Sequence, residues 1–182
     1  NYNNILIFQK LKRIKTVSKI NIKRNQYIDS RYILLNTKLK VGDFFNVEKI
    51  KEDIKSIFDL GYFTKVWVDT SPKGSSIDIS FLVEENPIIK NINIKVDSKI
   101  SPFFIKQNML LSPGKMMNWK IFQDDLNLIH KIYSNLGFLC TSIEDTNFED
   151  GELSFSLNLA TIEKLNTNNI AIKDQLEKLN FS

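Results

Sequence analysis

The sequence predicts an α+β fold of two tandem βααββ units, each a three-stranded mixed sheet packed under two antiparallel helices, followed by the possible start of a third unit. Two observations predict this fold. A capped amphipathic helix that ends at a glycine occurs twice, at 41–63 and at 112–139, and strand-like segments with alternating apolar residues flank both copies. Gly42 and Asn46 return 72 residues later as Gly114 and Asn118. A repeat at a fixed offset indicates a duplicated structural unit.

The helix expected after Asn46 is the clearest element of the first unit. Asn46 is a good N-cap, because its side-chain oxygen can accept a hydrogen bond from a free amide of the first turn. Apolar residues then recur at three- and four-residue steps, which places them on one helical face: Ile50, Ile54, Ile57 and Phe58. Gly61 can supply the left-handed residue that ends the helix.

Two shorter elements are expected before this helix. Val17–Ile22 reads as a strand in which Ile20 and Ile22 face the same side. Asp29 or Ser30 then caps a first helix, whose apolar residues are Ile33, Leu34 and Leu39, with Tyr32 alongside.

A hairpin is expected after Gly61. Thr64–Thr70 alternates, with Val66 and Val68 on one face and Trp67 on the other. The segment 71–75 contains a proline and a glycine and is predicted to be a turn. The returning strand alternates strictly through Ile77, Ile79, Phe81 and Val83.

Pro87 marks the expected boundary between the two units, because proline cannot donate to a strand ladder. The predicted domains are 14–86 and 87–160, and 161–182 is either the start of a third unit or a tail. In the second unit we expect a hairpin turn at Glu149–Glu152. Its long helix is expected to carry one apolar stripe of Phe122, Leu126, Ile129, Tyr133 and Leu136.

The composition of the 182 residues is typical of a globular protein, with 42% hydrophobic and 25% charged residues. The net charge of +4 comes from basic residues scattered among acidic ones, which favours a solvated surface over a nucleic-acid or membrane patch. A single cysteine excludes an internal disulfide. The chain begins at Asn1 without a methionine, so we expect it to be a piece of a longer protein.

Residues that could carry catalysis or bind metal are few. His130 is the only histidine and lies off the apolar stripe of its helix, which makes a surface position the natural interpretation. One histidine and one cysteine cannot supply a zinc-type ligand set, and the sequence contains no nucleophile elbow and no glycine-rich phosphate loop. Asp124 and Asp125 are expected on a solvated helix face rather than as an acid–base pair. The sequence therefore predicts no enzyme, no cofactor and no metal site.

Several phrases of the sequence carry a family resemblance. VSKINIKRN, KVGDFFNVEKIKEDIKSIFDLGYFTKV and IDISFLVEENPIIKNINI resemble POTRA (polypeptide-transport-associated) domains, over roughly Ile14 to Leu159. These domains occur in tandem before the membrane barrel of BamA-type outer-membrane assembly factors and their organelle relatives. The chain departs from the family pattern after the first strand of each unit, at Arg24–Asn25 and Val96–Asp97, and at Ala160, which stands where the first unit has Glu84.

The resemblance implies a non-catalytic, soluble region that handles unfolded or partly folded client polypeptides and docks accessory proteins, with the membrane barrel outside this chain. It also implies that the second strand of each unit lies at a sheet edge, to which an extended client can add as a further strand. The candidate edge residues are Thr64, Lys65, Val66, Trp67, Val68, Asp69 and Thr70 in the first unit and Thr141, Ser142, Ile143 and Glu144, within Thr141–Thr146, in the second. Trp67 belongs either to this edge or to a contact with a neighbouring unit.

Other functions remain open at this stage. The same element order occurs in KH-like modules that bind single-stranded nucleic acid, but the loops between the helices lack their G-x-x-G motif. A rigid spacer that docks folded partners is a third possibility. The resemblance places the chain on the periplasmic side of an outer membrane or in the intermembrane space of a plastid-type organelle. It does not choose between barrel assembly, preprotein import and secretion.

Overall fold

The computed structural model describes residues 15–96 and 101–161. Its contacts divide the chain into two compact units. The first comprises the described part of Asn1–Ile89 together with Gly114–Gln123, and the second comprises the described parts of Lys90–Pro113 and Asp124–Ser182. The predicted third unit or tail, 161–182, lies outside the described residues except for Thr161. The domain boundaries at 86 and 160 stay a prediction.

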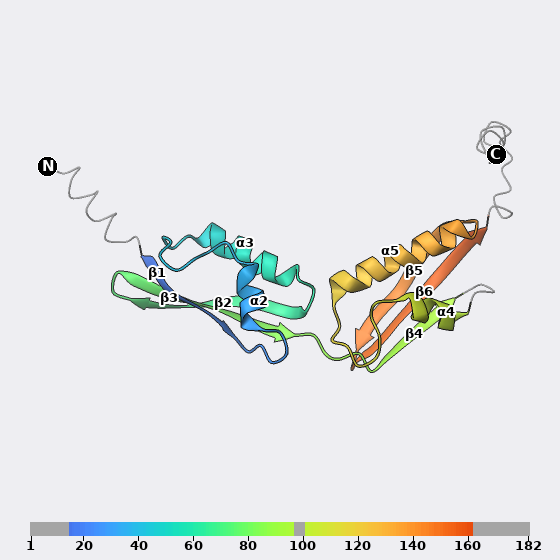
Figure 1. The fold of residues 1–182 in the computed structure, drawn as a ribbon, viewed down its shortest axis with the longest axis horizontal. Helices are drawn as coiled ribbons and strands as arrows, with labels where there is room; N and C mark the ends of the chain where they lie inside the picture. The colour runs from blue at the N-terminus through green and yellow to red at the C-terminus, as the bar shows by residue number, and fades with distance from the viewer. Residues whose placement is uncertain (1–14, 97–100, 162–182) are drawn as a thin grey trace, which may run out of the picture. The chain divides into compact units, whose positions relative to one another are not determined.

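The first unit contains two complete helices, the start of a third and one three-stranded sheet, and its elements up to residue 85 follow the predicted order. These are β1 (Thr16–Lys23), α2 (Ser30–Leu35), α3 (Val47–Phe58), β2 (Phe63–Lys73) and β3 (Ser76–Glu85). The strands lie in the order β1-β3-β2, with β1 parallel and β2 antiparallel to β3. Both helices cover the same face of the sheet (Figure 1).

The core of the first unit lies between this sheet and the helices. The central strand β3 turns alternate side chains inward, so its predicted 2-residue period is confirmed. The buried apolar residues of this core are Val17, Ile33, Leu39, Ile50, Ile57, Phe63, Ile77, Ile79, Phe81 and Val83.

Caps at both ends hold α3 in place. The Asn46 side chain accepts a hydrogen bond from the Lys49 amide at 3.1 Å, and Gly61 has a φ of +83°, as predicted for the N-cap and the glycine stop. Asp53 on α3 is fully buried and accepts hydrogen bonds from the amides of Lys38 (2.6 Å) and Leu39 (3.0 Å). The carboxylate thereby satisfies two donors of the loop that follows α2.

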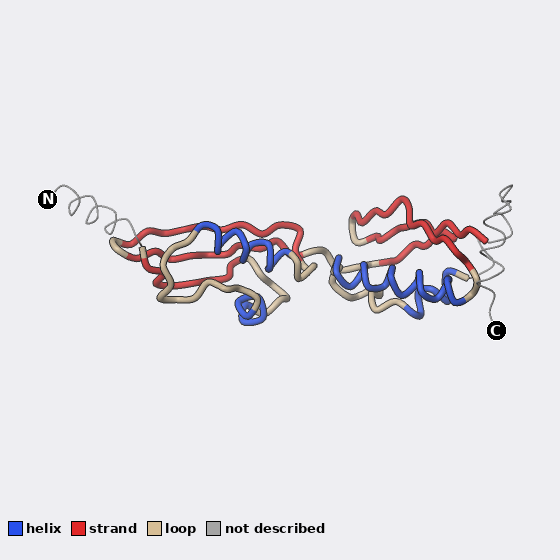
Figure 2. Tube along the Cα trace, turned by 90° about the horizontal axis from the view of Figure 1, so that it is seen from above, coloured by secondary structure: helices blue, strands red, loops and turns tan. Residues whose placement is uncertain are grey.

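The remaining elements repeat the same plan. They are β4 (Asn91–Val96), α4 (Pro102–Asn108), α5 (Trp119–Asn135), β5 (Phe138–Glu149) and β6 (Glu152–Thr161). The sheet order is β4-β6-β5, again with one parallel and one antiparallel pair. The strands of each sheet lie side by side (Figure 2). The predicted α+β fold with two three-stranded mixed sheets is confirmed.

Four local predictions were wrong. Phe58, which was expected on the apolar face of α3, is 49% exposed. Helix α2 ends at Leu35, so Leu39 is buried from the following loop and not from the helix. Leu136 follows the last residue of α5 and is 57% exposed, although it was expected on the buried stripe. Strand β2 continues through Ser71, Pro72 and Lys73, and only Gly74 and Ser75 form the turn. No helix in the described ranges is both long enough and apolar enough to cross a membrane.

The turn after α3 makes a close contact inside the first compact unit. The Asn118 side chain donates to the Leu60 carbonyl (2.9 Å), and the Trp119 amide donates to the Gly61 carbonyl (3.0 Å). Asn118 also accepts from the Ile121 amide (2.9 Å), so it caps α5 at the same time. We call the interaction of Leu60 and Gly61 with Asn118 and Trp119 the Gly61 contact.

A buried asparagine completes the Gly61 contact. The Asn86 side chain is 4% exposed and donates to the carbonyls of Gly61 and Met117, both at 2.9 Å. Its oxygen accepts from the Thr64 hydroxyl at 2.9 Å. Every polar atom of this buried amide therefore has a partner.

Candidate functional site

Strand β2 forms one edge of the first sheet, as the resemblance implied, and β1 forms the other. The start of β1 is already covered by the loop before α3. The Gly42 amide donates to the Val17 carbonyl, and the Val17 amide donates to the Asp43 carbonyl, both at 2.8 Å. No other segment of the described chain pairs with the outer side of β2. Among the described residues, β2 is therefore the edge that is open along its whole length, whereas β1 is covered only at its start.

The register of the hairpin determines which backbone groups of β2 point outward. Hydrogen-bonded and non-hydrogen-bonded pairs alternate along an antiparallel ladder. Pro72 faces Ile77 and has no N–H, so this pair is a non-hydrogen-bonded one. By the same alternation Thr70, Val68 and Val66 direct their N–H and C=O groups away from β3. These three residues present free backbone donors and acceptors, and Pro72 ends the series.

The two faces of β2 differ in character. Val66 and Val68 are partly buried against the core of the first unit. Trp67 lies on the opposite face, where the Arg24 guanidinium stands 5.2 Å from the centre of its ring. The predicted alternation of these three side chains is thus present, and the Arg24 contact was not foreseen.

Strand β5 is the corresponding edge of the second sheet, but it is less regular. Its register with β6 shifts between Phe138 and Cys140 and again between Glu144 and Asn147, and Asp145 has a φ of +51°. Such irregularities bend a strand away from regular pairing. The predicted residues 141–144 pair continuously with β6, whereas β2 pairs continuously from Lys65 to Lys73. The longer regular edge is therefore β2.

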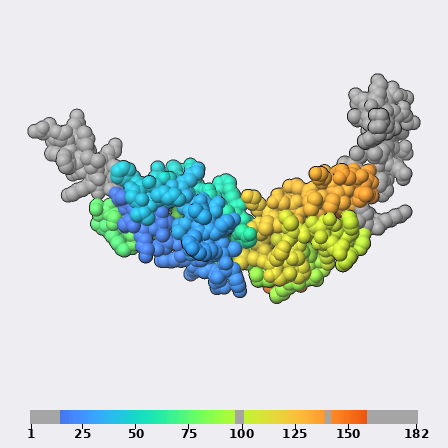
Figure 3. Space-filling view, in the orientation of Figure 1, coloured from blue at the N-terminus to red at the C-terminus, as the bar shows by residue number. Residues whose placement is uncertain are grey.

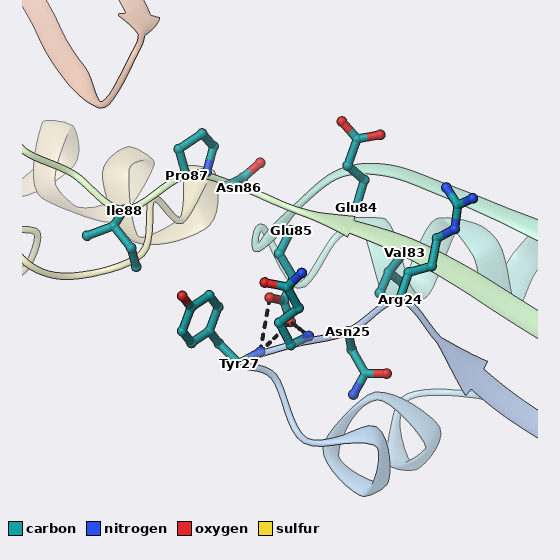
Figure 4. A pocket seen from close by; sticks show the side chains of 10 residues that line it. Arg24, Asn25, Tyr27, Val83, Glu84, Glu85, Asn86, Pro87 and Ile88 are labelled. Atoms are coloured by element: carbon teal, nitrogen blue, oxygen red, sulfur yellow. Dashed lines mark hydrogen bonds between the residues drawn. The ribbon is translucent and has the colours of Figure 1, made fainter.

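A surface pocket of about 580 Å³ lies beside the end of β3 in the first unit. Its walls come from the loop after β1 and from the chain around Glu85 (Figure 4). The Glu85 carboxylate accepts hydrogen bonds from three consecutive amides, those of Gln26, Tyr27 and Ile28, at 2.8–3.1 Å. These bonds satisfy the carboxylate and anchor the loop, which indicates a structural role.

The residues weighed for catalysis do not gather into a site. His130 is exposed on α5, and so is Asp124. Asp125 is fully buried and accepts hydrogen bonds from the amides of Leu110 (2.6 Å) and Leu111 (3.0 Å), so the prediction of a solvated face was wrong for this residue. It repeats the role of Asp53, 72 residues earlier. Among the described residues, no group of three or more His, Cys, Asp or Glu side chains could hold a metal ion.

Comparisons with known proteins agree with this architecture. A family model described as POTRA, surface antigen variable number repeat, matches residues 15–86 and 87–173. The chain is 27% identical over 122 residues to the outer membrane protein assembly factor BamA of Nitratidesulfovibrio vulgaris, a match that covers 67% of this chain and 15% of that protein. This chain therefore spans only a small part of that relative.

Solved structures with the same fold are known from cyanobacteria. The N-terminal domain of Omp85 from Thermosynechococcus elongatus has a TM-score of 0.69 at 13% identity, covering 79% of this chain and 62% of that one. POTRA1-2 of the periplasmic domain of Omp85 from Anabaena has a TM-score of 0.67 at 16% identity, covering 82% of this chain and 97% of that one. At these identities the likeness shows the fold alone. The family model matches most of the sequence, and the chain therefore belongs to the POTRA family.

Proposed function

We propose that this chain is the polypeptide-binding region of an outer-membrane protein assembly or translocation machine, and that it takes extended client segments as an added strand on β2. The pairing uses the backbone groups of Val66, Val68 and Thr70. Because main-chain hydrogen bonds are nearly independent of side-chain identity, such an edge suits a receptor for many clients. The role is non-catalytic.

The observation that carries the proposal is the open, regular edge of β2. Its register with β3 is unbroken from Lys65 to Lys73, and the outer side of this stretch has no partner in the described chain. The start of β1 is paired with the loop at Gly42 and Asp43. Within Thr64–Thr70, the outward backbone groups fall on every second residue, so a client strand would gain hydrogen bonds at that spacing.

The side chains beside this edge suggest a preference among clients. Alternate residues of an added strand would lie next to Val66 and Val68 on one face and next to Trp67 on the other. The first face is apolar. On the second face the Arg24 guanidinium lies 5.2 Å from the centre of the Trp67 ring. Clients with alternating apolar residues should therefore bind better than uniformly polar ones.

Strand β5 serves as a weaker, second edge in this proposal. Thr141, Ser142, Ile143 and Glu144 pair regularly with β6, but the register shift after Glu144 shortens the available ladder. A client would form fewer consecutive hydrogen bonds there. Accessory proteins of the same machine are proposed as further partners.

The names of the relatives support a setting for the proposed function. The Nitratidesulfovibrio relative is named an outer membrane protein assembly factor, and the Anabaena structure is named as part of a periplasmic domain. We place this chain correspondingly on the periplasmic side of an outer membrane, or in the intermembrane space of a plastid-type organelle, next to a membrane barrel in the longer protein.

A pair of substitutions at Thr70 tests the backbone mechanism. Thr70→Pro removes one outward N–H but no hydrogen bond to β3, and Pro72 already occupies the same kind of position in this strand. Thr70→Val keeps the N–H and changes only an exposed side chain. The probe is a fluorescein-labelled decapeptide of alternating valine and threonine with a lysine at each end, titrated with the full chain and followed by fluorescence anisotropy.

The expected result is a selective loss in the proline variant. Thr70→Pro should weaken binding about tenfold, because a lost hydrogen bond and the ring in the path of the client cost about 1–1.5 kcal/mol. Thr70→Val should stay within about twofold of the parent. Circular dichroism checks that both variants fold. Equal affinities of the two variants would show that β2 does not bind the peptide through its backbone.

A photo-crosslinker placed at position 67 gives an independent check on the location. It should capture the decapeptide far more efficiently than the same group at Lys51, an exposed residue on α3. Equal yields at both positions would contradict binding at β2.

A further inference from the structure

Arg24 has a backbone conformation that is uncommon for a residue with a side chain. It follows β1 directly and has a φ of +68°, a value that only glycine adopts without steric cost. The other two non-glycine residues with a positive φ in the described ranges are Asp145 and Asp150, and aspartate tolerates this conformation more readily than arginine. Glu85 holds the loop in place, because its carboxylate accepts from the three amides of residues 26–28. A strained position that the surroundings fix in this way points to a use for the side chain.

The Arg24 side chain crosses the sheet to the open edge. Lys23, Leu82 and Trp67 form one row across the three strands, on β1, β3 and β2. Arg24 follows Lys23, and its guanidinium lies 5.2 Å from the centre of the Trp67 ring. Because β3 separates β1 from β2, the side chain spans the central strand to reach this position. It points away from Glu85, which anchors the loop (Figure 4).

The Arg24 guanidinium contacts the indole and forms no ion pair within the described part of the chain. The two acidic residues at the end of β3 are engaged elsewhere. Glu84 pairs with Lys65 at 3.2 Å, and Glu85 is satisfied by the loop amides. An arginine on an aromatic ring still carries five N–H donors in a rigid plane, and this geometry matches a carboxylate. The edge strand therefore has a positioned cation beside it.

We propose that Arg24 is a specificity residue of the β2 edge, which selects client strands that carry an acidic side chain beside Trp67. This inference rests on the proposed pairing of clients with β2. In an antiparallel addition, Val66 and Val68 form the hydrogen bonds, so the client residue opposite Trp67 belongs to a non-hydrogen-bonded pair. The Cα atoms of such a pair are about 4.5 Å apart and its side chains are close together. A client carboxylate at this position lies next to the guanidinium.

Asp69 confines this preference to one position of the client. It lies two residues after Trp67 on the same face of β2, opposite Ser80, and it is exposed. A client carboxylate beside Asp69 would meet a like charge, which destabilises a cross-strand pair. One acidic residue should therefore improve binding more than acidic residues at every second position. General attraction to the net charge of +4 would instead grow with each added carboxylate.

The experiment compares three labelled peptides by fluorescence anisotropy with the full chain. The first is the neutral decapeptide of alternating valine and threonine, the second has one central threonine replaced by glutamate, and the third has every threonine replaced. The parent should bind the single-glutamate peptide about threefold to fivefold more tightly than the neutral one, as expected for an exposed ion pair. The peptide with every threonine replaced should bind less tightly than the single-glutamate peptide.

Two variants that each lose one positive charge locate the effect. Arg24→Gly should bind the neutral and single-glutamate peptides equally, and it should fold because glycine accepts the φ of +68°. Arg24→Asn is a second uncharged variant that tolerates this φ. Helices α2 and α3, which cover the other face of the sheet, form much of the visible surface of the first unit (Figure 3). Lys51→Gln removes its charge from α3 and should keep the preference.

Several results would overturn the role of Arg24. Equal affinities of the parent for the neutral and single-glutamate peptides exclude the preference. An affinity that rises with every glutamate, or a preference that persists in Arg24→Gly and Arg24→Asn, assigns it to general charge or to another residue. Thr70→Pro separates this outcome from the client-binding proposal. If only the role of Arg24 is wrong, Thr70→Pro still weakens both peptides, whereas it weakens neither if clients do not pair with β2.

Discussion

Gly61 offers the sharpest test of the packing described above. Its φ of +83° is costly for any residue with a Cβ, and the added atom would lie 2.4 Å from the Asn118 oxygen and 2.7 Å from the Lys120 nitrogen. Gly42, in the same compact unit, has a φ of +94°, and no atom of the described residues lies within 4 Å of its Cβ position. Alanine at the two sites therefore meets the same kind of backbone strain in different surroundings.

The expected magnitudes follow from these contacts. Gly42→Ala should lower the free energy of unfolding by about 1–2 kcal/mol, the cost of a left-handed residue that carries a Cβ. Gly61→Ala carries the same cost and also displaces Asn118 and Trp119. Three hydrogen bonds to Leu60 and Gly61 are then weakened, from Asn118, Trp119 and Asn86, at about 0.5–1.5 kcal/mol each. The total for Gly61→Ala is about 3–6 kcal/mol.

Tryptophan fluorescence during urea unfolding measures this difference directly. The two tryptophans, Trp67 and Trp119, both lie in the first compact unit, so the signal reports that unit alone. With a slope of about 1–2 kcal/mol per molar urea, the midpoint of Gly61→Ala should fall at least about 1 M further than that of Gly42→Ala. Equal midpoints for the two variants would refute the close approach at Gly61.

Two further predictions concern carboxylates. Asp125→Asn should lower the free energy of unfolding by about 2–4 kcal/mol, because an amide cannot accept from both buried backbone N–H groups. Asp124→Asn, on the exposed side of the same helix, should change the free energy of unfolding by less than about 0.5 kcal/mol. Circular dichroism in urea measures both variants, and similar losses would contradict the buried role of Asp125. The Lys73 ammonium and the Ser18 hydroxyl hold the pKa of Asp78 below its ordinary value of 3.8, so its stabilising contribution is complete above pH 3.8 and is lost as the pH falls through the lower folded-state pKa. Asp78→Asn should remove this part of the acid dependence of the urea midpoint, and an unchanged dependence would show that Asp78 is not its source.

The buried position of Asp125 could have been predicted from the repeat in the sequence. Asp53 and Asp125 stand at the same place in the two copies, yet an adjacent pair of aspartates on a helix is ordinarily a solvated face. Their partners are amides 14 and 15 residues upstream, in the loop after the first helix of each unit. An aspartate that recurs at the same place in both copies of the repeat could have indicated a structural hydrogen bond.

The predicted strand ended at Thr70, whereas β2 continues to Lys73. Proline and glycine within 71–75 favour a turn, and a proline cannot donate to a ladder. The structure keeps Pro72 inside the strand because its missing N–H points away from β3, where no donor is needed. For the same reason Pro72 is the first outward-facing position after Val66, Val68 and Thr70 that offers no backbone N–H.

The sequence by itself determined the duplicated βααββ plan, the helix cap at Asn46, the glycine stops and the inward face of β3, and it left the cap of α2 open between Asp29 and Ser30. These features depend on interactions within a few residues or on a regular period, so the side chains encode them locally. The family resemblance also favoured the POTRA family over the KH-like alternative, and the family model matches most of the chain.

Only the tertiary structure decided that the start of β1 is covered, that the register of β5 shifts after Glu144, and that Asn118 reaches the turn at Gly61. These outcomes depend on hydrogen bonds between backbone groups that lie far apart in the chain. Every residue except proline carries the same N–H and C=O, and so the side-chain pattern does not record which of those groups are left unpaired.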